Sequence, residues 1–445
     1  MGSTLQRKFG AWAAFAMIVA EVMGVGLFLT PAGMARTAGA TGWAWILGVW
    51  AVVGMLSVAG ALCFAELGSR FPEAGGGYVF LREAFGERTA FVYGWMALLV
   101  MDPGLTAALG VGLARYLLVA LGGPASLVPF VAVGSILVLA GISVMGLKSS
   151  SRLLRWTVVA KVAAIVVLLV AVLIRRDDSA AAPAVTAGGG ASFGVLAGAL
   201  MGAFFALGGW WDLGKMSEEI VNPRRTLPIA LVGGIIVVTV IYAQLSLAFI
   251  HALAGRALQT DEEFVSALGS TLFGSGASRI LAAVVIVAVA GSLAAVLLGA
   301  PRVYLAMARG GVFPSGLVRF HPTRQSAGRA TLIQVVLACT LVTFGTFDQI
   351  IGYFVPIVVF FLGLSAAAIL VLPRPQHDTA VFRTPWHPLP IVLFLVLVVV
   401  MIVLFTTGRP MQTLVGASVV ALGIPASFFV LKPRRAAQAP AALES

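Results

Sequence analysis

Long apolar stretches, separated by short polar loops, run through almost the whole chain. A helix needs about 20 consecutive apolar residues to cross the hydrocarbon core of a membrane. The runs are continuous and lack the two-residue alternation of a membrane β-barrel, so we expect an all-α membrane protein. The pattern predicts twelve transmembrane helices, at residues 11–34, 42–68, 88–120, 127–147, 153–174, 192–217, 227–253, 277–307, 329–346, 349–372, 388–406 and 411–431.

The composition agrees with this pattern. Hydrophobic residues make up 60% of the 445 residues, and only 10% of the residues are charged. A soluble domain carries about 25% charged residues, and a soluble protein this apolar could not cover its surface with polar groups. We therefore interpret residues 1–445 as a single transmembrane domain embedded in a lipid bilayer.

The net charge of +12 raises the alternative of a nucleic-acid-binding protein. The basic residues do not form one basic face, however. They lie in short loops between apolar runs, where they set the orientation of a membrane protein. With the N-terminus inside, 21 Lys and Arg residues fall on inner segments and 6 on outer segments. The pattern predicts a multi-pass protein of a plasma or inner membrane, with both termini cytoplasmic and no nucleic-acid partner.

The sequence predicts neither a metal site nor another cofactor. Cys63 and Cys339 both lie inside apolar runs, and the four histidines have no paired spacing. The chain has no H-E-x-x-H motif and no cluster of Asp and His residues, which argues against an enzyme embedded in the membrane.

Glycines interrupt two of the predicted spans near mid-membrane, at residues 23–28 (MGVGLF) and 207–212 (LGGWWD). Glycine weakens a helix, and the freed backbone groups are tolerated in hydrocarbon only beside protein or a water-filled cavity. A helix N-terminus offers amides to a carboxylate, and a helix C-terminus offers carbonyls to an ammonium. Since an α-amino acid carries both charges, the two breaks predict an amino acid as the small-molecule substrate.

Glycines in membrane helices also serve for close packing alone, and the chain has 51 of them. The location of these two groups, in spans one and six, favours a binding site instead. Interrupted helices at corresponding places in two halves are typical of transporters built from inverted repeats. A channel would need a continuous polar pore, which two breaks in one chain do not indicate.

Five segments in order along the chain carry a family resemblance: MGVGLFLTP, AELGSRFPEAGGGYVFLREAFG, WMALLVMDPGLTAA, FFALGGWWDLGKMSEEIVNPRRTLP and PRVYLAMARGGVFP. They resemble the amino acid–polyamine–organocation (APC) superfamily, and within it the L-type amino acid transporters and their bacterial relatives. The resemblance implies a leucine-transporter-like fold, a 5+5 inverted repeat in which helices one and six are broken. The first repeat would then be residues 11–174, the second 192–372, and two peripheral helices would follow at 388–431.

The resemblance also implies the contacts of the substrate. The backbone amides around Gly24, Val25 and Gly26 would hold its carboxylate. Phe205 would be an aromatic gate on the outward side, although ordinary core packing describes most of the 27 phenylalanines. The ammonium would be held by backbone carbonyls, those of Val22, Phe205, Ala206 and Gly208. By the same resemblance, Ser292 in span eight and Tyr353 in span ten would project toward the pocket.

The chain departs from the family at three positions. Val25 stands where a serine is common, so a hydroxyl is lost while the backbone amide remains. Asp102 stands where the eukaryotic members have an arginine, and Leu207 replaces a frequent aromatic residue. These departures concern side chains, so they affect specificity more than the general site.

Two ionisable residues inside spans are functional candidates, because charge in the membrane is costly. The resemblance places Lys161 where related sodium-coupled transporters bind a second sodium ion. It could supply a permanent positive charge, lose its proton during the transport cycle, or merely extend to the membrane interface. Glu21, just before the first break, could pair with Lys161 or line an inner vestibule.

The pocket positions are apolar or contribute backbone, which favours a neutral amino acid over arginine, lysine or a polyamine. The sequence thus predicts a secondary transporter, either an exchanger or a proton-coupled permease, with antiport of cationic amino acids or polyamines as the alternative. Eukaryotic L-type relatives carry an extracellular cysteine that links a glycoprotein partner. The loop at 122–126 has no cysteine, so we expect no disulfide-linked partner.

Overall fold

The computed structural model describes residues 7, 9–24, 26, 30, 43–145, 147–174, 193–252, 268–272, 274, 277–317, 328–345, 347–373 and 381–437. Within these ranges the chain is mostly helical and forms no β-sheet; Phe9 and Ile220 form an isolated β-bridge. The protein is therefore all-α over the part of the chain that the structure describes.

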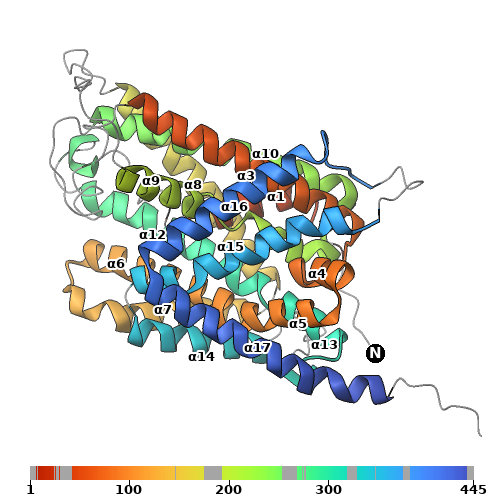
Figure 1. Ribbon diagram of the computed structural model, residues 1–445. Helices are drawn as coiled ribbons and strands as arrows, with labels where there is room; N and C mark the ends of the chain where they lie inside the picture. Colours follow the sequence, from red (N-terminus) through yellow and green to blue (C-terminus); the bar gives the residue numbers. More distant parts are fainter. Residues whose placement is uncertain are drawn as a thin grey trace, which may run out of the picture.

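The first half of the chain forms a series of helices that belong to one bundle (Figure 1). A π-helical segment, η1, joins α5 to α6 without a loop, so both belong to one continuous helix. The elements are α1 (Ala11–Val22), α3 (Trp43–Arg70), α4 (Gly77–Phe85), α5 (Glu87–Met96), η1 (Ala97–Met101), α6 (Asp102–Leu121), η2 (Ala125–Leu127), α7 (Val128–Val144) and α8 (Leu147–Ile174).

The second half of the chain is also helical. A ten-residue 3₁₀ segment, η3, follows α9. The elements of this half are α9 (Phe193–Ala206), η3 (Trp210–Glu219), α10 (Pro223–Ala252), α12 (Ala277–Gly299), α13 (Pro301–Arg309), η4 (Ser315–Leu317), α14 (Gly328–Phe344), α15 (Phe347–Val371), α16 (Leu389–Gly408) and α17 (Pro410–Ala437).

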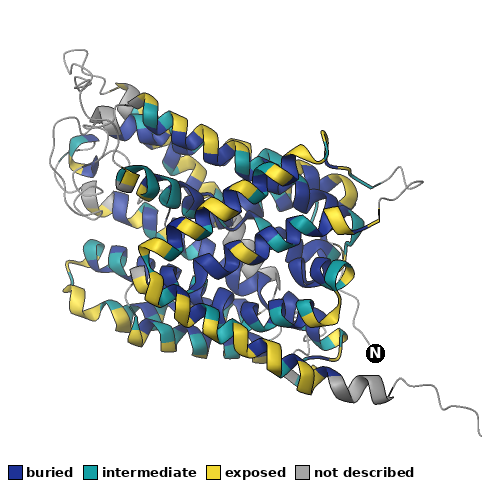
Figure 2. Cartoon of the chain, viewed as in Figure 1, coloured by how far each residue is buried: buried dark blue, intermediate teal, exposed yellow. Residues whose placement is uncertain are grey.

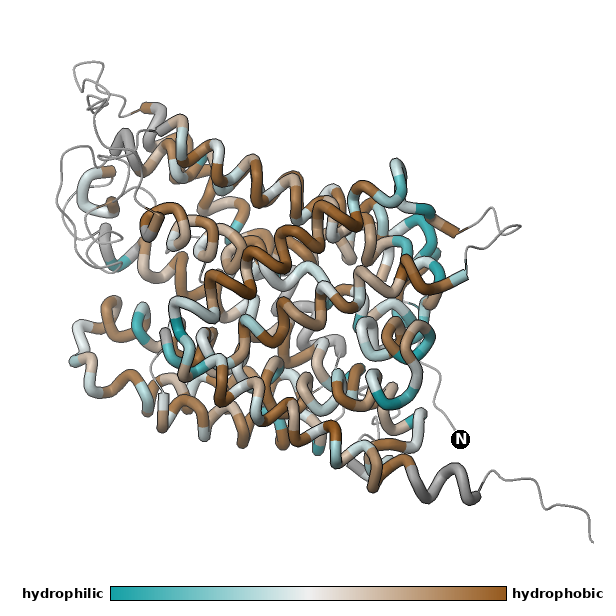
Figure 3. The backbone as a smooth tube through the Cα atoms, viewed as in Figure 1, coloured by the Kyte–Doolittle hydropathy of each residue, from teal (hydrophilic) through white to brown (hydrophobic). Residues whose placement is uncertain are grey.

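Among the described residues, nine helical stretches are long and apolar enough to cross a membrane. Three shorter apolar helices, Ala11–Val22, Trp156–Ala171 and Gly328–Phe344, lie within the other predicted spans. Figure 3 shows hydrophobic positions along the length of the bundle and a concentration of hydrophilic ones near α4. The chain is thus a multi-pass membrane protein.

The distribution of exposed and buried residues is that of a protein surrounded by lipid. Large apolar side chains such as Phe130, Val159 and Leu332 are exposed on the outer surface, whereas charged side chains such as Lys161 and Lys215 are buried inside (Figure 2). Water would not favour so apolar a surface, but hydrocarbon does.

Helix α1 lies in the interior, where it packs against α8, α10, α12 and η3. Helices α16 and α17 both contact α15, and α16 also packs against α3. The close approach of α3 to α10 depends on small residues, because a Cβ atom at Gly54 would lie 2.4 Å from Cγ2 of Thr239. This geometry is common between membrane helices, where dispersion contacts hold the bundle together.

Replacing Gly54 by valine should destabilise the bundle. The extra carbons would overlap Thr239, and overpacking of this kind costs about 1–3 kcal/mol. Gly48 on the same helix offers a matched control, since a Cβ atom there meets nothing within 4 Å. Thermal unfolding in detergent should give a lower melting temperature for Gly54→Val and an almost unchanged one for Gly48→Val. Equal melting temperatures would contradict the described α3–α10 contact.

Candidate functional site

The α1 helix ends at Val22, inside the bundle, and the chain turns at Met23 and Gly24. The amide of Gly24 donates to the carbonyl oxygen of Val22 at 2.8 Å, and the hydroxyl of Tyr242 donates to the same oxygen at 3.0 Å. The protein itself therefore satisfies this carbonyl, as the absence of water from hydrocarbon requires. Both lone pairs of the Val22 carbonyl are used, which leaves it little capacity to receive a ligand ammonium.

The α9 helix ends at Ala206, and η3 begins four residues later. Between them the amide of Gly208 donates to the carbonyl of Phe205 at 3.1 Å. Gly209 has a φ of +106°, a conformation that favours glycine. A Cβ atom on Gly209 would also lie 3.0 Å from Cγ of Glu21. Glycine is required here both by the backbone conformation and by the closeness of α1.

These two helix interruptions lie against each other. A Cβ atom on Gly26 would come within 2.6 Å of Cα of Ala206, and one on Gly24 within 2.9 Å of Oγ of Ser292. The backbones of the two interrupted segments can approach this closely only because side chains are absent. The fold thereby places segments about 180 residues apart in the sequence at one site.

A cavity lies beside the two interruptions, walled by α1, the η1–α6 segment, α9, η3, α12 and α15. Among the predicted site residues, Glu21, Val22, Gly24, Gly26, Phe205 and Gly208 line it. Other parts of the wall are apolar side chains and glycine, contributed by Met101, Leu105, Leu109, Phe204, Gly209, Trp211, Val296, Phe354, Val355, Val358 and Val359. Glu21 is the one ionisable side chain among these lining residues.

Several predicted site residues take other places. Val25 lies outside the described residues. Ser292 and Ala206 lie behind the wall rather than on it, in contact with Gly24 and Gly26. Tyr353 was expected to point into the pocket, but its hydroxyl donates to the carbonyl of Leu99 at 3.2 Å and its neighbour Phe354 lines the cavity instead. The rotation of α15 about its axis decides which of its side chains faces the cavity. The almost uniformly apolar sequence of that helix does not specify this rotation.

Lys161 joins three helices. Its ammonium, on α8, donates to the carbonyl oxygen of Ala20 on α1 at 2.6 Å and to Oγ of Ser292 on α12 at 3.2 Å. Ser292 also donates to the Ala20 carbonyl, at 2.7 Å. The side chain is only 1% exposed, so it does not extend to the membrane interface. Lys161 therefore links the end of α1 to α8 and α12.

Glu21 and Lys161 do not form the ion pair that was one of the two alternatives for Glu21. The two groups are close enough to interact electrostatically, but the ammonium donates to Ala20 and Ser292, and both carboxyl oxygens of Glu21 lack a hydrogen-bond partner within the described part of the chain. The Lys161 ammonium is instead satisfied by a backbone carbonyl and a hydroxyl.

A second buried lysine, Lys215, was not predicted from the sequence. Nζ of Lys215 on η3 lies 2.9 Å from Oδ1 of Asp102 and 2.9 Å from Oδ1 of Asp212. The hydroxyl of Tyr304 donates to Oδ2 of Asp102 at 2.8 Å. All four side chains are buried. Two features of the sequence could have indicated this site. Asp102 is unusual at its position, and Asp212 and Lys215 are spaced one helical turn apart.

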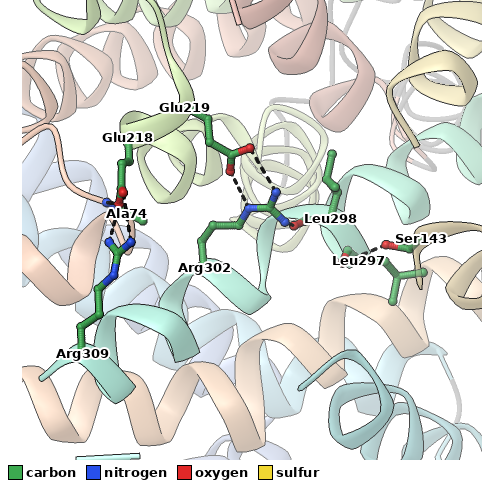
Figure 4. A network of polar contacts seen from close by, with 8 residues as sticks. All are labelled: Ala74, Ser143, Glu218, Glu219, Leu297, Leu298, Arg302 and Arg309. Carbon is green, nitrogen blue, oxygen red and sulfur yellow. Dashed lines mark hydrogen bonds and ion pairs between the residues drawn. The ribbon is translucent and has the colours of Figure 1, made fainter. Parts of the chain in front are cut away.

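Ion pairs join η3 to α13 (Figure 4). Nε of Arg302 lies 2.8 Å from Oε1 of the buried Glu219, and Nη2 of Arg309 lies 3.0 Å from Oε1 of Glu218. The amide of Ala74, before α4, donates to Glu218 at 3.3 Å. These contacts tie the segment after the second interruption to α13.

The residues before α1 bind the end of η3. The amide of Phe9 donates to the carbonyl of Glu219 at 3.0 Å, and the amide of Val221 donates to the carbonyl of Phe9 at 2.8 Å. The start of the first interrupted helix is therefore joined to the segment that follows the second interruption.

A family model described as amino acid permease matches residues 9–425. The chain is 26% identical to the serine/threonine exchanger SteT of Bacillus subtilis, over 86% of this chain and 87% of that one. It is 27% identical to the human large neutral amino acids transporter small subunit 2, over 96% and 81% of the two chains. It is 25% identical to the human cystine/glutamate transporter, over 97% and 87%.

Removing one partner of the Arg302–Glu219 pair should strongly destabilise the protein. A buried ion left without its counter-ion costs about 3–5 kcal/mol. Arg302→Ala and Glu219→Ala should each lower the resistance to unfolding in detergent. The double variant should lose less than the sum of the two single losses, as coupled residues do. Strictly additive losses in this double-mutant cycle would contradict the coupling.

Proposed function

Because the chain belongs to the amino acid permease family, we propose that it carries neutral amino acids across the membrane by alternating access, as an exchanger or a proton-coupled permease. Transport of amino acids follows from the family itself, whose members here are transporters rather than enzymes. The preference for neutral side chains and the coupling mode are the parts that we propose.

The apolar wall of the cavity is the observation that carries this proposal. The cavity adjoins both helix interruptions, yet its lining side chains other than Glu21 carry no charge. Such a wall favours an uncharged substrate side chain, because burying a charge without a partner is costly. Apolar pockets discriminate poorly between similar side chains, so we expect a range of neutral substrates.

The main-chain ends beside the cavity would bind the charged groups of the substrate. The amides around Gly24, Val25 and Gly26 would receive the carboxylate, and the carbonyls around Phe205, Ala206 and Gly208 the ammonium. The Val22 carbonyl would contribute less in this conformation, because two protein donors already occupy it. Phe205, on the cavity wall, would act as the gate.

Lys161 would serve as the internal cation of the transport cycle. It holds the carbonyl of Ala20, two residues before the end of α1, and so links the position of that end to α8 and α12. A movement of α1 during alternating access would have to stretch or break these hydrogen bonds. Ser292 would take part in the same link rather than contact the substrate.

The topology we propose has twelve spans, arranged as a 5+5 inverted repeat. The nine long and three shorter apolar helices of the described residues are consistent with it. The repeats would be residues 11–174 and 192–372, with 388–431 forming two peripheral helices. The distribution of Lys and Arg residues supports cytoplasmic termini in a plasma or inner membrane.

Exchange is favoured among the coupling modes because one relative bears the name serine/threonine exchanger. We propose no disulfide-linked partner, since Cys63 is buried in α3 and Cys339 lies on α14. Glu21 favours one alternative, antiport of cationic amino acids or polyamines, because its carboxyl on the wall could receive a second cation.

Uptake into proteoliposomes tests this function. Radiolabelled serine, leucine, phenylalanine, arginine and putrescine would be offered with and without internal amino acid, and with and without a pH gradient. We expect saturable uptake of the neutral amino acids, accelerated by internal amino acid. If arginine or putrescine is taken up in preference, the protein is an antiporter of cationic substrates and not a carrier of neutral amino acids. If none of the five compounds is taken up, the proposal is overturned.

Gly26→Leu should abolish binding and uptake while the protein still inserts into the membrane. Even a Cβ atom at this position would come within 2.6 Å of Cα of Ala206 and separate the two interruptions. Gly198→Leu on α9 is the matched control, since its Cβ atom would meet nothing within 4 Å. Unchanged uptake by Gly26→Leu would show that the substrate binds elsewhere.

Lys161→Ala should reduce the transport rate at least about tenfold, equivalent to about 1.4 kcal/mol at the rate-limiting barrier, because the cross-link between α1, α8 and α12 is lost. Arg88→Ala, which removes a cation stacked on Phe428 at the periphery, controls for the loss of a basic side chain. Initial rates over a range of pH values would be compared. A wild-type rate with an unaltered pH profile would exclude a role for Lys161 in transport.

A further inference from the structure

Glu21 is an unexplained carboxyl group. It occupies the last turn of α1, is 7% exposed and lines the cavity. Neither of its oxygens has a hydrogen-bond partner in the part of the chain that the structure describes. A buried polar atom without a partner costs free energy, which points to a ligand or a proton that satisfies it.

A second acid interacts with Glu21. The carboxyl of Asp212 on η3 lies within side-chain hydrogen-bonding range of the Glu21 carboxyl. Gly209, which precedes η3, allows this approach because a side chain there would collide with Cγ of Glu21. Ionised carboxylates only accept hydrogen bonds, so two carboxyls can bond to each other only when one of them carries a proton.

The other charged groups around Glu21 do not supply that missing positive charge. Lys215 is shared between Asp212 and Asp102, whose second oxygen accepts from Tyr304. Lys161, from α8, donates to Ala20 and Ser292 instead of to Glu21. From α10, the hydroxyl of Tyr242 donates to the Val22 carbonyl.

A charge count leads to the same conclusion. The buried cluster contains three carboxyls, those of Glu21, Asp102 and Asp212, and two amines, those of Lys161 and Lys215. Full ionisation would leave one negative charge unbalanced inside the membrane. Two neighbouring carboxylates in a medium of low polarity share one proton rather than both ionise. One added cation, either a proton or an ammonium, neutralises the cluster.

We propose that Glu21 and Asp212 form a shared proton-binding site and that the ammonium group of an entering substrate replaces this proton. The inference rests on the proposed function, since it requires an amino acid in the cavity that Glu21 lines. The O–H bond of the protonated carboxyl breaks, the proton leaves to water, and the carboxylate then accepts a hydrogen bond from the substrate ammonium. No electron transfer is involved.

Competition between a proton and an ammonium has a definite signature. Substrate binding should release up to one proton, and the affinity should fall as the pH is lowered through the titration of the pair. In that range the dissociation constant should rise by up to about tenfold per pH unit. A binding site without this competition would have the same affinity for the substrate at every pH in this range.

The experiment uses the full-length protein in detergent and tritiated L-serine, L-leucine and L-arginine as probes. Dissociation constants would be measured between about pH 5 and pH 8, and proton release would be followed with a pH indicator in weak buffer. Glu21→Gln keeps the shape and the acceptor oxygen but cannot ionise. Glu66→Gln is the matched control, a buried acid of α3 that accepts from the amide of Thr384, away from the cavity.

We expect the wild type and Glu66→Gln to release a proton on binding, and Glu21→Gln to bind without release and with an affinity independent of pH. Release of the same size from Glu21→Gln, or none from the wild type, would overturn the proposal. If no probe binds to the wild type, the proposed function itself fails. Binding without proton release leaves that function standing and removes only the proton site.

Infrared spectroscopy of the wild type provides a test that needs no variant. The substrate-free protein should show the C=O stretch of a protonated carboxylic acid, and this band should disappear when a binding probe is added. A difference spectrum without loss of this band would overturn the proposal even if Glu21→Gln fails to fold.

Discussion

Backbone polar groups must find partners inside the protein wherever a helix stops within hydrocarbon, and the structure around the site is organised by this constraint. The carbonyl of Val22 receives Gly24 and Tyr242, and that of Ala20 receives Lys161 and Ser292. The bonds from Tyr242, Lys161 and Ser292 hold α10, α8 and α12 against the end of α1. The glycines that permit the interruption also allow the second interrupted segment to approach, so the site and the core packing depend on the same contacts.

The buried charges also determine which segments can move relative to each other. Lys161 and Lys215 each bind groups from more than one helix, and Arg302 binds Glu219, the last residue of η3. Breaking any of these contacts exposes a charge to an apolar surrounding, so the segments joined by them should move together. The ion pairs around α13 and the buried charges near the cavity are therefore connected through η3, which carries Asp212 and Lys215 as well as Glu218 and Glu219 (Figure 4).

Much of the architecture could be predicted from the pattern of apolar residues, because hydrocarbon thickness sets the length of a span and leaves few alternatives. The two interruptions were found from their glycines, and the described helices α1 and α9 end beside them. The partners of buried charges could not be found in this way. Whether Lys161 meets Glu21 or the Ala20 carbonyl depends on rotations of α8 and α1 of less than one residue spacing, and an apolar helix carries no sequence pattern that specifies its rotation.

The sequence by itself determined that the chain crosses a membrane, where its helices are interrupted, and which family it resembles, because these properties follow from local composition and from ordered motifs. The tertiary structure alone decided that Phe354 rather than Tyr353 lines the cavity and that Asp102 pairs with Lys215 across 113 positions of sequence. It also decided that Glu21 lies beside Asp212. These outcomes depend on which faces of α6, α15 and η3 turn toward α1, a choice made by the packing of the whole bundle.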